Sequence, residues 1–152
     1  TGNFEHYTSR GRLKGFLDAM KEADLIPVDE HIQCGDYSID GGYEAMLRIW
    51  KKKKRPTAIF ISNYDMTIGA YLAINYLNLK IPDDISVIGF DNFPLANVVN
   101  PPLSFAEQPT NEMGTEAGKL LYKRICGDYS DYPQTIMHKP TMYYKESIRK
   151  IN

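Results

Sequence analysis

The sequence predicts an α/β fold built on a parallel, doubly wound sheet, and three observations support this prediction. Helical and strand patterns alternate along most of the chain, which is the order of βαβ units. The segment at 85–88 is apolar almost throughout and rich in β-branched residues, as expected of a strand covered on both faces. The length of 152 residues suffices for one domain with a core of its own.

The first part of the chain carries two amphipathic helices with a strand between them. Apolar residues recur at helical spacing over 11–23, and Thr8 or Ser9 is the expected N-cap. A short strand is predicted at 32–35. A second helix follows over 39–50, because its apolar residues also fall on one helical face.

A buried strand and a third helix are predicted next. Residues 57–62 form a short, β-branched apolar run that is typical of a covered strand. The segment 63–65 then caps a helix whose apolar stripe extends from Met66 to Leu77. Asn78 is the expected C-terminal cap of this helix.

After the strand at 85–88, the remaining elements become shorter, with one exception. A short helix near 95–99 must end at the two prolines that follow Asn100, since proline cannot continue a helix. A strand is predicted at 103–106. The exception is a long helix at 110–126, for which Gly127 is the expected stop. The tail is predicted to form two short strands, at 135–138 and at 141–144.

Composition argues against several classes of protein. Basic and acidic residues number 18 and 19, so the net charge of −1 gives no overall cationic field for nucleic acid or an anionic membrane. The basic run at 51–55 is interpreted as a helix end, where cations are favoured. Cys34 and Cys126 lie far apart, which predicts free thiols in a reducing compartment. No apolar run approaches the roughly 20 residues that span a bilayer, and residues 1–6 lack the pattern of a signal peptide.

Polar and aromatic side chains fall where the predicted strands end. Tyr37, Asn63 and Asp91 each follow a strand, and Arg12 lies in the first turn of a helix. Parallel topology places these positions on one rim of the sheet, where ligands bind in open α/β folds. A guanidinium, a carboxylate, an amide and an aromatic ring together suit a polyhydroxylated small molecule. The competing interpretation is local: Asn63 and Asp91 as helix N-caps, Arg12 as a solvated helix residue and Tyr37 as a packing residue.

Sequence signals for catalysis are few. The three histidines are far apart and lack metal-ligand spacing. No nucleophile elbow, phosphate-binding loop or dinucleotide fingerprint is present. Asp36, Asp65 and Asp91 remain candidates for an acid/base set, although each also has a cap or turn explanation. We therefore predict a binding protein that is not an enzyme and uses neither a metal ion nor a cofactor.

A set of short motifs resembles a known family almost from end to end. The motifs lie at 12–16, 35–38, 55–60, 66–70, 81–92, 101–103, 108–114 and 144–147. They are similar to the effector-binding core of lactose/galactose-repressor-type bacterial transcription regulators, which share the fold of periplasmic sugar-binding proteins. The resemblance implies that the chain is mostly the second of two lobes, with an incomplete first lobe and no DNA-binding domain.

By position, the resemblance implies that Arg12, Asn63 and Asp91 hydrogen-bond effector hydroxyls and that Tyr37 stacks on the ring. The further ligand candidates are Tyr64, Asn92 and Gln108. Tyr64 stands where the family usually has an aspartate after the asparagine, so the acid here follows one residue later, at Asp65. The resemblance also implies a homodimer formed by helix faces whose simpler interpretation is packing on the sheet. The candidate interface residues are Tyr43, Met46, Met66, Ala70, Ala73 and Pro94.

The expected organisation follows from the same resemblance. Residues 1–104 would form the second lobe, 105–130 a crossing segment and helix of the other lobe, and 131–152 the strands that return. Because the first element is a helix, the strand expected before Thr1 is either missing or supplied by another chain. The expected function is effector binding by a cytoplasmic transcription repressor that contacts operator DNA only through the absent N-terminal region and contacts no membrane. The alternatives are a periplasmic sugar-binding protein of a transporter and, more remotely, an α/β enzyme.

Overall fold

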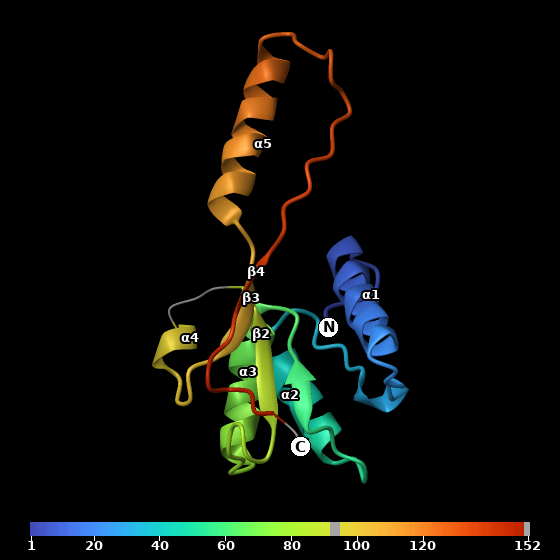
Figure 1. Ribbon diagram of the computed structural model, residues 1–152, viewed down its shortest axis with the longest axis vertical. Helices are drawn as coiled ribbons and strands as arrows, with labels where there is room; N and C mark the ends of the chain where they lie inside the picture. Colours follow the sequence, from blue (N-terminus) through green and yellow to red (C-terminus); the bar gives the residue numbers. More distant parts are fainter. Residues whose placement is uncertain (92–94, 151–152) are drawn as a thin grey trace.

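The computed structural model describes residues 1–91 and 95–150 (Figure 1). Helices and strands alternate over most of this length, as predicted. The elements, in chain order, are α1 (Tyr7–Glu22), the 3-10 helix η1 (Asp29–His31), α2 (Ile39–Trp50), β1 (Ala58–Phe60), α3 (Tyr64–Tyr76), β2 (Ser86–Phe90), α4 (Leu95–Val98), β3 (Ser104–Glu107), α5 (Thr110–Ile125) and β4 (Thr141–Tyr143).

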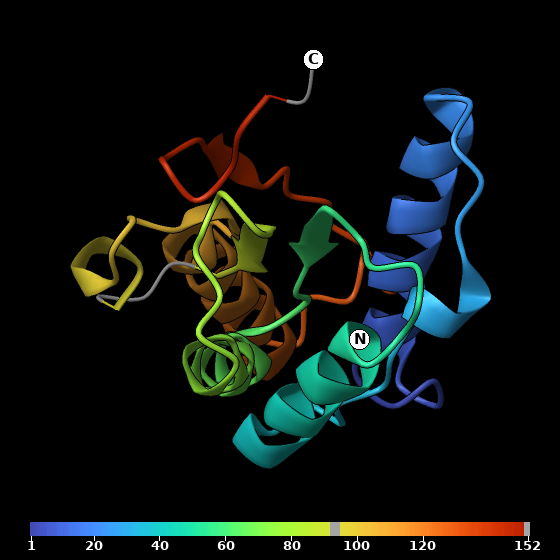
Figure 2. The ribbon, with the colours of Figure 1, turned by 90° about the horizontal axis from the view of Figure 1, so that it is seen from below.

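The sheet has the order β1-β2-β3-β4, and the prediction of a parallel α/β sheet is confirmed. β1, β2 and β3 are parallel, whereas β4 pairs antiparallel with β3. Helices α2 and α3 lie together along one side of the sheet, α1 stands beyond the β1 edge, and α5 projects away from the remaining elements (Figures 1 and 2). The first three strands therefore end at the same side of the sheet, which places the residues after them on one rim.

The core lies between the sheet and the pair α2 and α3. Met46, Ile74, Val87 and Leu103 are fully buried there, contributed by both helices, β2 and the approach to β3. The two helices approach very closely because Gly69 of α3 faces the backbone of α2, where an added Cβ would overlap the Ile39 carbonyl oxygen. Burying apolar surface in this way supplies most of the stabilisation of a domain of this size.

Local capping determines where several helices begin and end. The Asn63 side chain accepts a hydrogen bond from the Met66 N–H at 3.1 Å, which makes Asn63 the predicted N-cap of α3. Asn78, with φ of 55°, and Gly127, with φ of 81°, follow the ends of α3 and α5, so both predicted stops are confirmed. The N-cap prediction for α1 is wrong: the helix already begins at Tyr7.

The C-terminal tail is fixed to the sheet by Ser147. This fully buried side chain donates to the Val87 carbonyl at 2.6 Å and accepts from the Ser104 N–H at 2.7 Å. The Val87 N–H in turn donates to the Ser147 carbonyl at 2.8 Å. The tail therefore joins β2 to the start of β3, although it is not itself part of a regular strand there.

Two strand predictions fail, and a third strand is present but shorter than predicted. Residues 32–35 and 135–138 form no strand, and β1 is shorter than the predicted 57–62. Ala58 and Phe60 are also exposed instead of buried. A strand requires a hydrogen-bonded neighbour. Residues 135–138 have none among the described residues, and β1 is paired only on its β2 side.

Tyr71 on α3 provides a test of the core. Its hydroxyl group is buried without a hydrogen-bond partner among the described residues, and burial raises its pKa to about 12. We expect Tyr71→Phe to stabilise the protein by about 1 kcal/mol at neutral pH, because the unsatisfied hydroxyl is removed. Above the usual pKa of 10.0, the unfolded chain loses the phenolic proton that the folded chain keeps, so wild-type stability should fall between pH 10 and about 12. Urea unfolding at neutral and alkaline pH checks both effects; a variant that is less stable than wild type would contradict the expectation.

Candidate functional site

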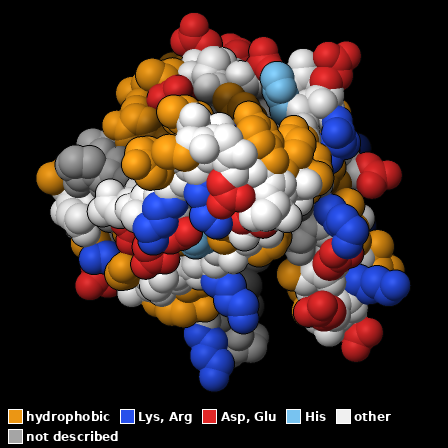
Figure 3. All heavy atoms as spheres, turned by 90° about the horizontal axis from the view of Figure 1, so that it is seen from above, with side chains coloured by type: hydrophobic (Ala, Val, Ile, Leu, Met, Phe, Trp, Pro, Cys, Tyr) orange, Lys and Arg blue, Asp and Glu red, His pale blue; other side chains and the backbone are white. Residues whose placement is uncertain are grey.

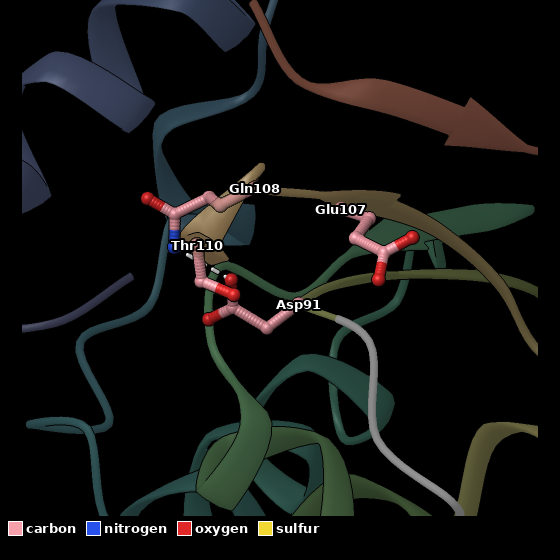
Figure 4. A pocket seen from close by; sticks show the side chains of 4 residues that line it. All are labelled: Asp91, Glu107, Gln108 and Thr110. Carbon is pink, nitrogen blue, oxygen red and sulfur yellow. Dashed lines mark hydrogen bonds between the residues drawn. The ribbon is translucent and has the colours of Figure 1, made fainter. Parts of the chain in front are cut away.

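The rim formed by the ends of β2 and β3 contains a paired carboxylate and amide. Asp91 directly follows β2, and Gln108 directly follows β3. The Gln108 Nε2 group donates to Asp91 Oδ1 at 2.6 Å (Figure 4), and the Asp91 N–H donates to the Ala106 carbonyl at 2.7 Å. This network holds the carboxylate at the rim and leaves its second oxygen as an acceptor site.

The backbone of Asp91 is in an unusual conformation. Its φ of 83° lies in the left-handed region, which costs a residue with a side chain of the order of 1 kcal/mol or more. The residue is not glycine despite this cost. Asp24 and Asn78, which follow helix ends, share a positive φ, so this backbone conformation does not by itself mark a functional residue.

A shallow pocket opens beside this pair. It has a volume of about 180 Å³ and is lined by Asp91, Glu107, Gln108 and Thr110 (Figure 4). A second hollow of about 240 Å³ adjoins it on the side of Tyr143. The neighbouring Glu107 carboxylate raises the pKa of Tyr143 through a side-chain hydrogen bond. The lining is therefore rich in hydrogen-bonding groups.

Arg12 connects α1 to the ends of two strands. Its Nη1 donates to the carbonyl of Ser62, just after β1. Its guanidinium carbon lies 3.9 Å from the ring centroid of Phe90, the last residue of β2, and 5.8 Å from that of Tyr37. Arg12 is half-buried, so the interpretation as a freely solvated helix residue does not hold.

Tyr37 is held in place by the start of the chain. It and Asp36 both have positive φ, of 55° and 49°. The Tyr37 hydroxyl accepts a hydrogen bond from Ser9 Oγ at 2.9 Å. Its ring lies against Gly2, where any side chain would overlap the ring, and stacks near His6 with centroids 6.4 Å apart. The packing role is therefore established for Tyr37, and the ring remains half-buried beside Arg12.

Asn63 serves as a helix cap through its side-chain oxygen, as the local interpretation anticipated. Tyr64 begins α3 and is 36% exposed. The structure thus places Arg12, Tyr37, Asn63 and Asp91 at one end of the sheet. Arg12 contacts Tyr37 directly, and it contacts Ser62 and Phe90, the residues that precede Asn63 and Asp91. Asn92 and Pro94 lie outside the described residues.

Several residues at this rim escaped sequence reasoning. Phe90 supplies the ring under Arg12, the Ser62 carbonyl accepts from it, and Glu107 and Thr110 line the pocket. Phe90 carried a usable signal, because an aromatic residue directly precedes the acid at the strand exit. The contact between Arg12 and the Ser62 carbonyl carried no signal in the sequence, since every residue has a backbone carbonyl.

The dimer candidates need correction. Met46, Met66, Ala70 and Ala73 are at most 5% exposed and belong to the chain's own core, so the simpler interpretation of a sheet-packing face holds for them. Tyr43 is half-buried, with its ring centroid 6.3 Å from that of Tyr76. Among the described side chains, the large apolar ones that α3 and α4 expose are instead Tyr64, Leu72, Tyr76 and Val98.

Other predicted features can be checked against the described part of the chain. Within residues 1–91 and 95–150, no group of three or more histidine, cysteine, aspartate or glutamate side chains could hold a metal ion. In the same ranges, no helix has the length and apolarity needed to cross a membrane. Cys34 and Cys126 are free thiols, as predicted.

An open, largely parallel sheet with polar and aromatic groups gathered at its strand ends is an arrangement in which α/β proteins commonly bind small molecules. The chain belongs to the family of periplasmic binding protein-like domains, which matches residues 1–148. The resemblance to lactose/galactose-repressor-type regulators is confirmed by the curated relatives and by the solved structures.

Several of the similar proteins are bacterial transcription regulators. The chain is 38% identical over 148 residues to the HTH-type transcriptional repressor PurR of Edwardsiella ictaluri, covering 97% of this chain and 43% of that protein. It superposes on the transcriptional repressor ascG of Escherichia coli with a TM-score of 0.83, at 28% identity, over 97% of this chain and 53% of the other. A sugar-binding transcriptional regulator of the LacI family from E. coli gives a TM-score of 0.80 at 26% identity, over 97% of this chain and 52% of the other. The chain thus spans about half the length of the proteins it matches.

Proposed function

We propose that this chain is the effector-binding and dimerisation part of a bacterial transcription repressor, in which ligand binding controls the affinity for operator DNA. The observation that carries the proposal is the rim itself: an Asp91 carboxylate held by Gln108 and an Arg12 guanidinium held over Phe90, in a chain whose relatives are repressors. We assign the DNA contacts to the part of such repressors that lies outside the 43% matched by this chain.

The proposed effector is a sugar or a related small polyhydroxylated molecule. Each hydroxyl of such a ligand both donates and accepts hydrogen bonds, and a stripped polar group costs about 1 to 3 kcal/mol. Carboxylate and amide oxygens at Asp91, Gln108 and Asn63 accept, and the guanidinium of Arg12 donates. Tyr37 and Phe90 add the apolar surface that suits the face of a sugar ring. A sugar-binding regulator with the same fold is consistent with this assignment.

The regulatory step follows from a two-lobed organisation. We assign 1–104 to one lobe, 105–130 to a segment that completes the other, and 131–152 to the return. Figure 3 views the molecule from the α5 end, where apolar side chains are exposed, and α5 itself exposes Leu121, Tyr122 and Ile125. A ligand that binds one arrangement of the lobes more tightly than the other shifts their equilibrium, and this shift changes DNA affinity.

Two further assignments complete the proposal. The protein is proposed to bind its ligand without turning it over, since the relatives are regulators. It acts in the cytoplasm, where DNA and a reducing environment are found, which agrees with two free cysteines. A periplasmic transport protein is the alternative, and it is disfavoured because the relatives are repressors.

The binding proposal is tested by saturation-transfer NMR on the 152-residue chain with D-ribose, D-galactose, cellobiose and adenosine. We expect signal transfer to at least one of these ligands, and loss of that transfer in Arg12→Ala. The matched control is Arg10→Ala, because Arg10 lies on the same helix and, within residues 1–91 and 95–150, donates only to the Phe4 and Glu5 carbonyls. Equal transfer in Arg12→Ala and wild type, or turnover of a ligand, would refute the proposal.

The dimer is proposed to use the exposed face of α3 and α4. Tyr76 is 70% exposed on this face, so its replacement by aspartate would place a charge in the interface. We expect Tyr76→Asp to weaken dimerisation at least about tenfold, measured by analytical ultracentrifugation. Tyr122→Asp, at a 69% exposed tyrosine on α5, is the matched control and should leave the dimer intact. A wild-type chain that stays monomeric at all concentrations would contradict the proposal.

A further inference from the structure

Positive charge is concentrated in the loop between α2 and β1. Residues 51–55, here called the basic loop, have the sequence Lys-Lys-Lys-Lys-Arg. The side chains of Lys51, Lys53 and Lys54 are exposed, and within residues 1–91 and 95–150 none of them forms an ion pair or a side-chain hydrogen bond. Like charges placed this close repel one another, so an anion bound among them would relieve an unfavourable interaction.

The end of α2 does not account for all of these charges. A helix C-terminus favours cations within its last turn. α2 ends at Trp50 with Lys51 as its C-cap residue, so Lys53 and Lys54 lie beyond the reach of this effect. These two lysines therefore carry charge that the helix itself does not use.

The basic loop is held in place by contacts on both sides. Arg55 Nε donates to the Trp50 carbonyl at 3.0 Å, and the Arg55 guanidinium carbon lies 4.6 Å from the centroid of the Trp50 ring. The His31 Nε2 group donates to the Lys54 carbonyl at 2.7 Å, because a carbonyl oxygen can only accept. The free lysine side chains therefore extend from a backbone of defined shape, which lowers the entropy cost of binding.

An exposed apolar turn adjoins the basic loop. Residues 25–28, between α1 and η1, form this apolar turn, and Leu25, Ile26 and Val28 are 55%, 89% and 41% exposed. Glu30 lies just after the turn and pairs with Lys52 at 3.1 Å, so the turn and the basic loop belong to one surface. Exposed apolar side chains rimmed by polar ones are typical of a protein-binding surface.

This surface lies at the end of the sheet opposite to the rim that contains Asp91. The basic loop precedes β1, whereas Gln108 and α5 follow β3. Because β1, β2 and β3 are parallel, the surface and the rim are at opposite ends of the strands, and α5 projects from the end that carries the rim (Figure 1). The segment 105–130, assigned above to the other lobe, therefore leaves the sheet at the end away from the basic loop and the apolar turn.

We propose that the basic loop and the apolar turn form a docking surface for a short acidic segment of a partner protein. Carboxylates of that segment lie among the ammonium groups of Lys51, Lys53 and Lys54, and its apolar side chains pack on Leu25 and Ile26. Charge complementarity of this kind steers association and selects the partner, while apolar contacts supply much of the affinity. Such a site lets a second protein act on the chain without occupying the effector rim.

The exposed acids around this surface favour a narrow partner. Asp24 and Asp29 flank the apolar turn, and Asp83 and Asp84 precede β2 at the same end of the sheet as the basic loop. A DNA duplex or a flat anionic membrane would bring its phosphates against these carboxylates as well as against the lysines, and like charges repel. A single peptide segment can follow the lysines and the apolar turn alone.

The test measures binding of short fluorescent peptides to the 152-residue chain by anisotropy. The first peptide is Glu-Leu-Glu-Glu-Leu-Leu-Glu-Asp-Leu-Glu. The second has serine in place of each leucine, and the third has lysine in place of each acid. A labelled DNA duplex of unrelated sequence and vesicles of phosphatidylglycerol and phosphatidylcholine are the probes for the two alternative partners.

Two sets of variants locate the surface that binds. The basic loop is changed by combining Lys51→Gln, Lys53→Gln and Lys54→Gln, and the apolar turn is changed by Ile26→Ser. The matched controls alter exposed side chains of the same kind elsewhere. They are Ile125→Ser and the combination of Lys14→Gln, Lys119→Gln and Lys139→Gln.

We expect the first peptide to bind wild type, and its affinity to fall at least about tenfold in the basic-loop variant, with a smaller loss in Ile26→Ser and none in the controls. The second peptide should bind more weakly than the first, and the third should not bind. Equal affinity in the basic-loop variant and wild type would overturn the proposal, as would no binding at millimolar peptide.

The remaining outcomes identify a different partner and would also overturn the proposal. Tighter binding of the duplex or the vesicles through the same lysines would identify nucleic acid or a membrane. Weaker dimerisation of the basic-loop variant without peptide would identify a second copy. The proposal is independent of the effector assignment: Arg12→Ala should leave peptide binding unchanged, and the basic-loop variant should leave sugar binding unchanged.

Discussion

Gly69→Ala is expected to destabilise the protein by about 3 kcal/mol, which is the upper end of the usual cost of overpacking. The added methyl group would overlap the Ile39 carbonyl oxygen and approach the Tyr43 backbone nitrogen to 2.6 Å. These are backbone atoms of α2, so relief requires the two helices to separate. Their separation would loosen the core around Met46 and Ile74, both of which are at most 2% exposed.

The matched control for this change is Gly118→Ala on α5. Nothing lies within 4 Å of the position that its Cβ would take, and the residue is exposed within a helix. Here the same substitution should stabilise the protein by up to about 1 kcal/mol, because alanine has the higher helix propensity. Urea unfolding gives both values. If Gly69→Ala were as stable as wild type, the close approach of α2 and α3 would be disproved.

Asp91→Gly is expected to separate stability from ligand binding. Glycine adopts the observed φ of 83° without steric strain, so the free energy of unfolding should change by less than about 1 kcal/mol, even though the hydrogen bond from Gln108 is lost. Ligand affinity should nevertheless fall at least about tenfold, on the order of 1.4 kcal/mol, because the carboxylate acceptor is gone.

Asp91→Asn refines this second prediction. Asparagine also tolerates positive φ and can still accept from Gln108, but its amide nitrogen replaces the second carboxylate oxygen, so the charge and one acceptor are removed while a side-chain polar group remains. We expect an affinity between those of wild type and Asp91→Gly, measured by NMR titration of the ligand that binds best. An unchanged affinity in Asp91→Gly, with the fold intact, would reduce Asp91 to a structural residue at the strand exit.

The helices were the most predictable part of this fold. The pattern over 39–50 matches α2, and the long helix expected at 110–126 is α5. Helices can be predicted in this way because their apolar spacing and their caps, such as Asn63 and Gly127, depend only on residues a few positions away in the sequence. The strand expected at 32–35 failed because pairing depends on a neighbour that local sequence does not specify. The strand β1 has the sequence of a buried strand, but Phe60 is exposed because a neighbouring strand covers only one edge of β1 in the described residues.

The candidate site was predictable in its location but not in its contacts. Parallel topology alone brings the exits of β1, β2 and β3 to one rim, and this predicted the placement of Asn63 and Asp91 at that rim. The stacking of Arg12 on Phe90 depends on how α1 sits against the strand ends, which no periodicity encodes. The positive φ of Asp91 was equally hidden, because aspartate adopts many other conformations.

Backbone amide chemical shifts, followed by two-dimensional ¹H–¹⁵N NMR during titration with the sugar that shows transfer, test the proposed function most directly. The account predicts that the largest shifts occur at Arg12, Tyr37, Asn63, Asp91 and Gln108, and that the exposed face of α5 at Leu121 and Ile125 does not respond. Shifts confined to other surfaces, or no shifts with any of the four ligands at millimolar concentration, would contradict the assignment of the rim as an effector-binding site.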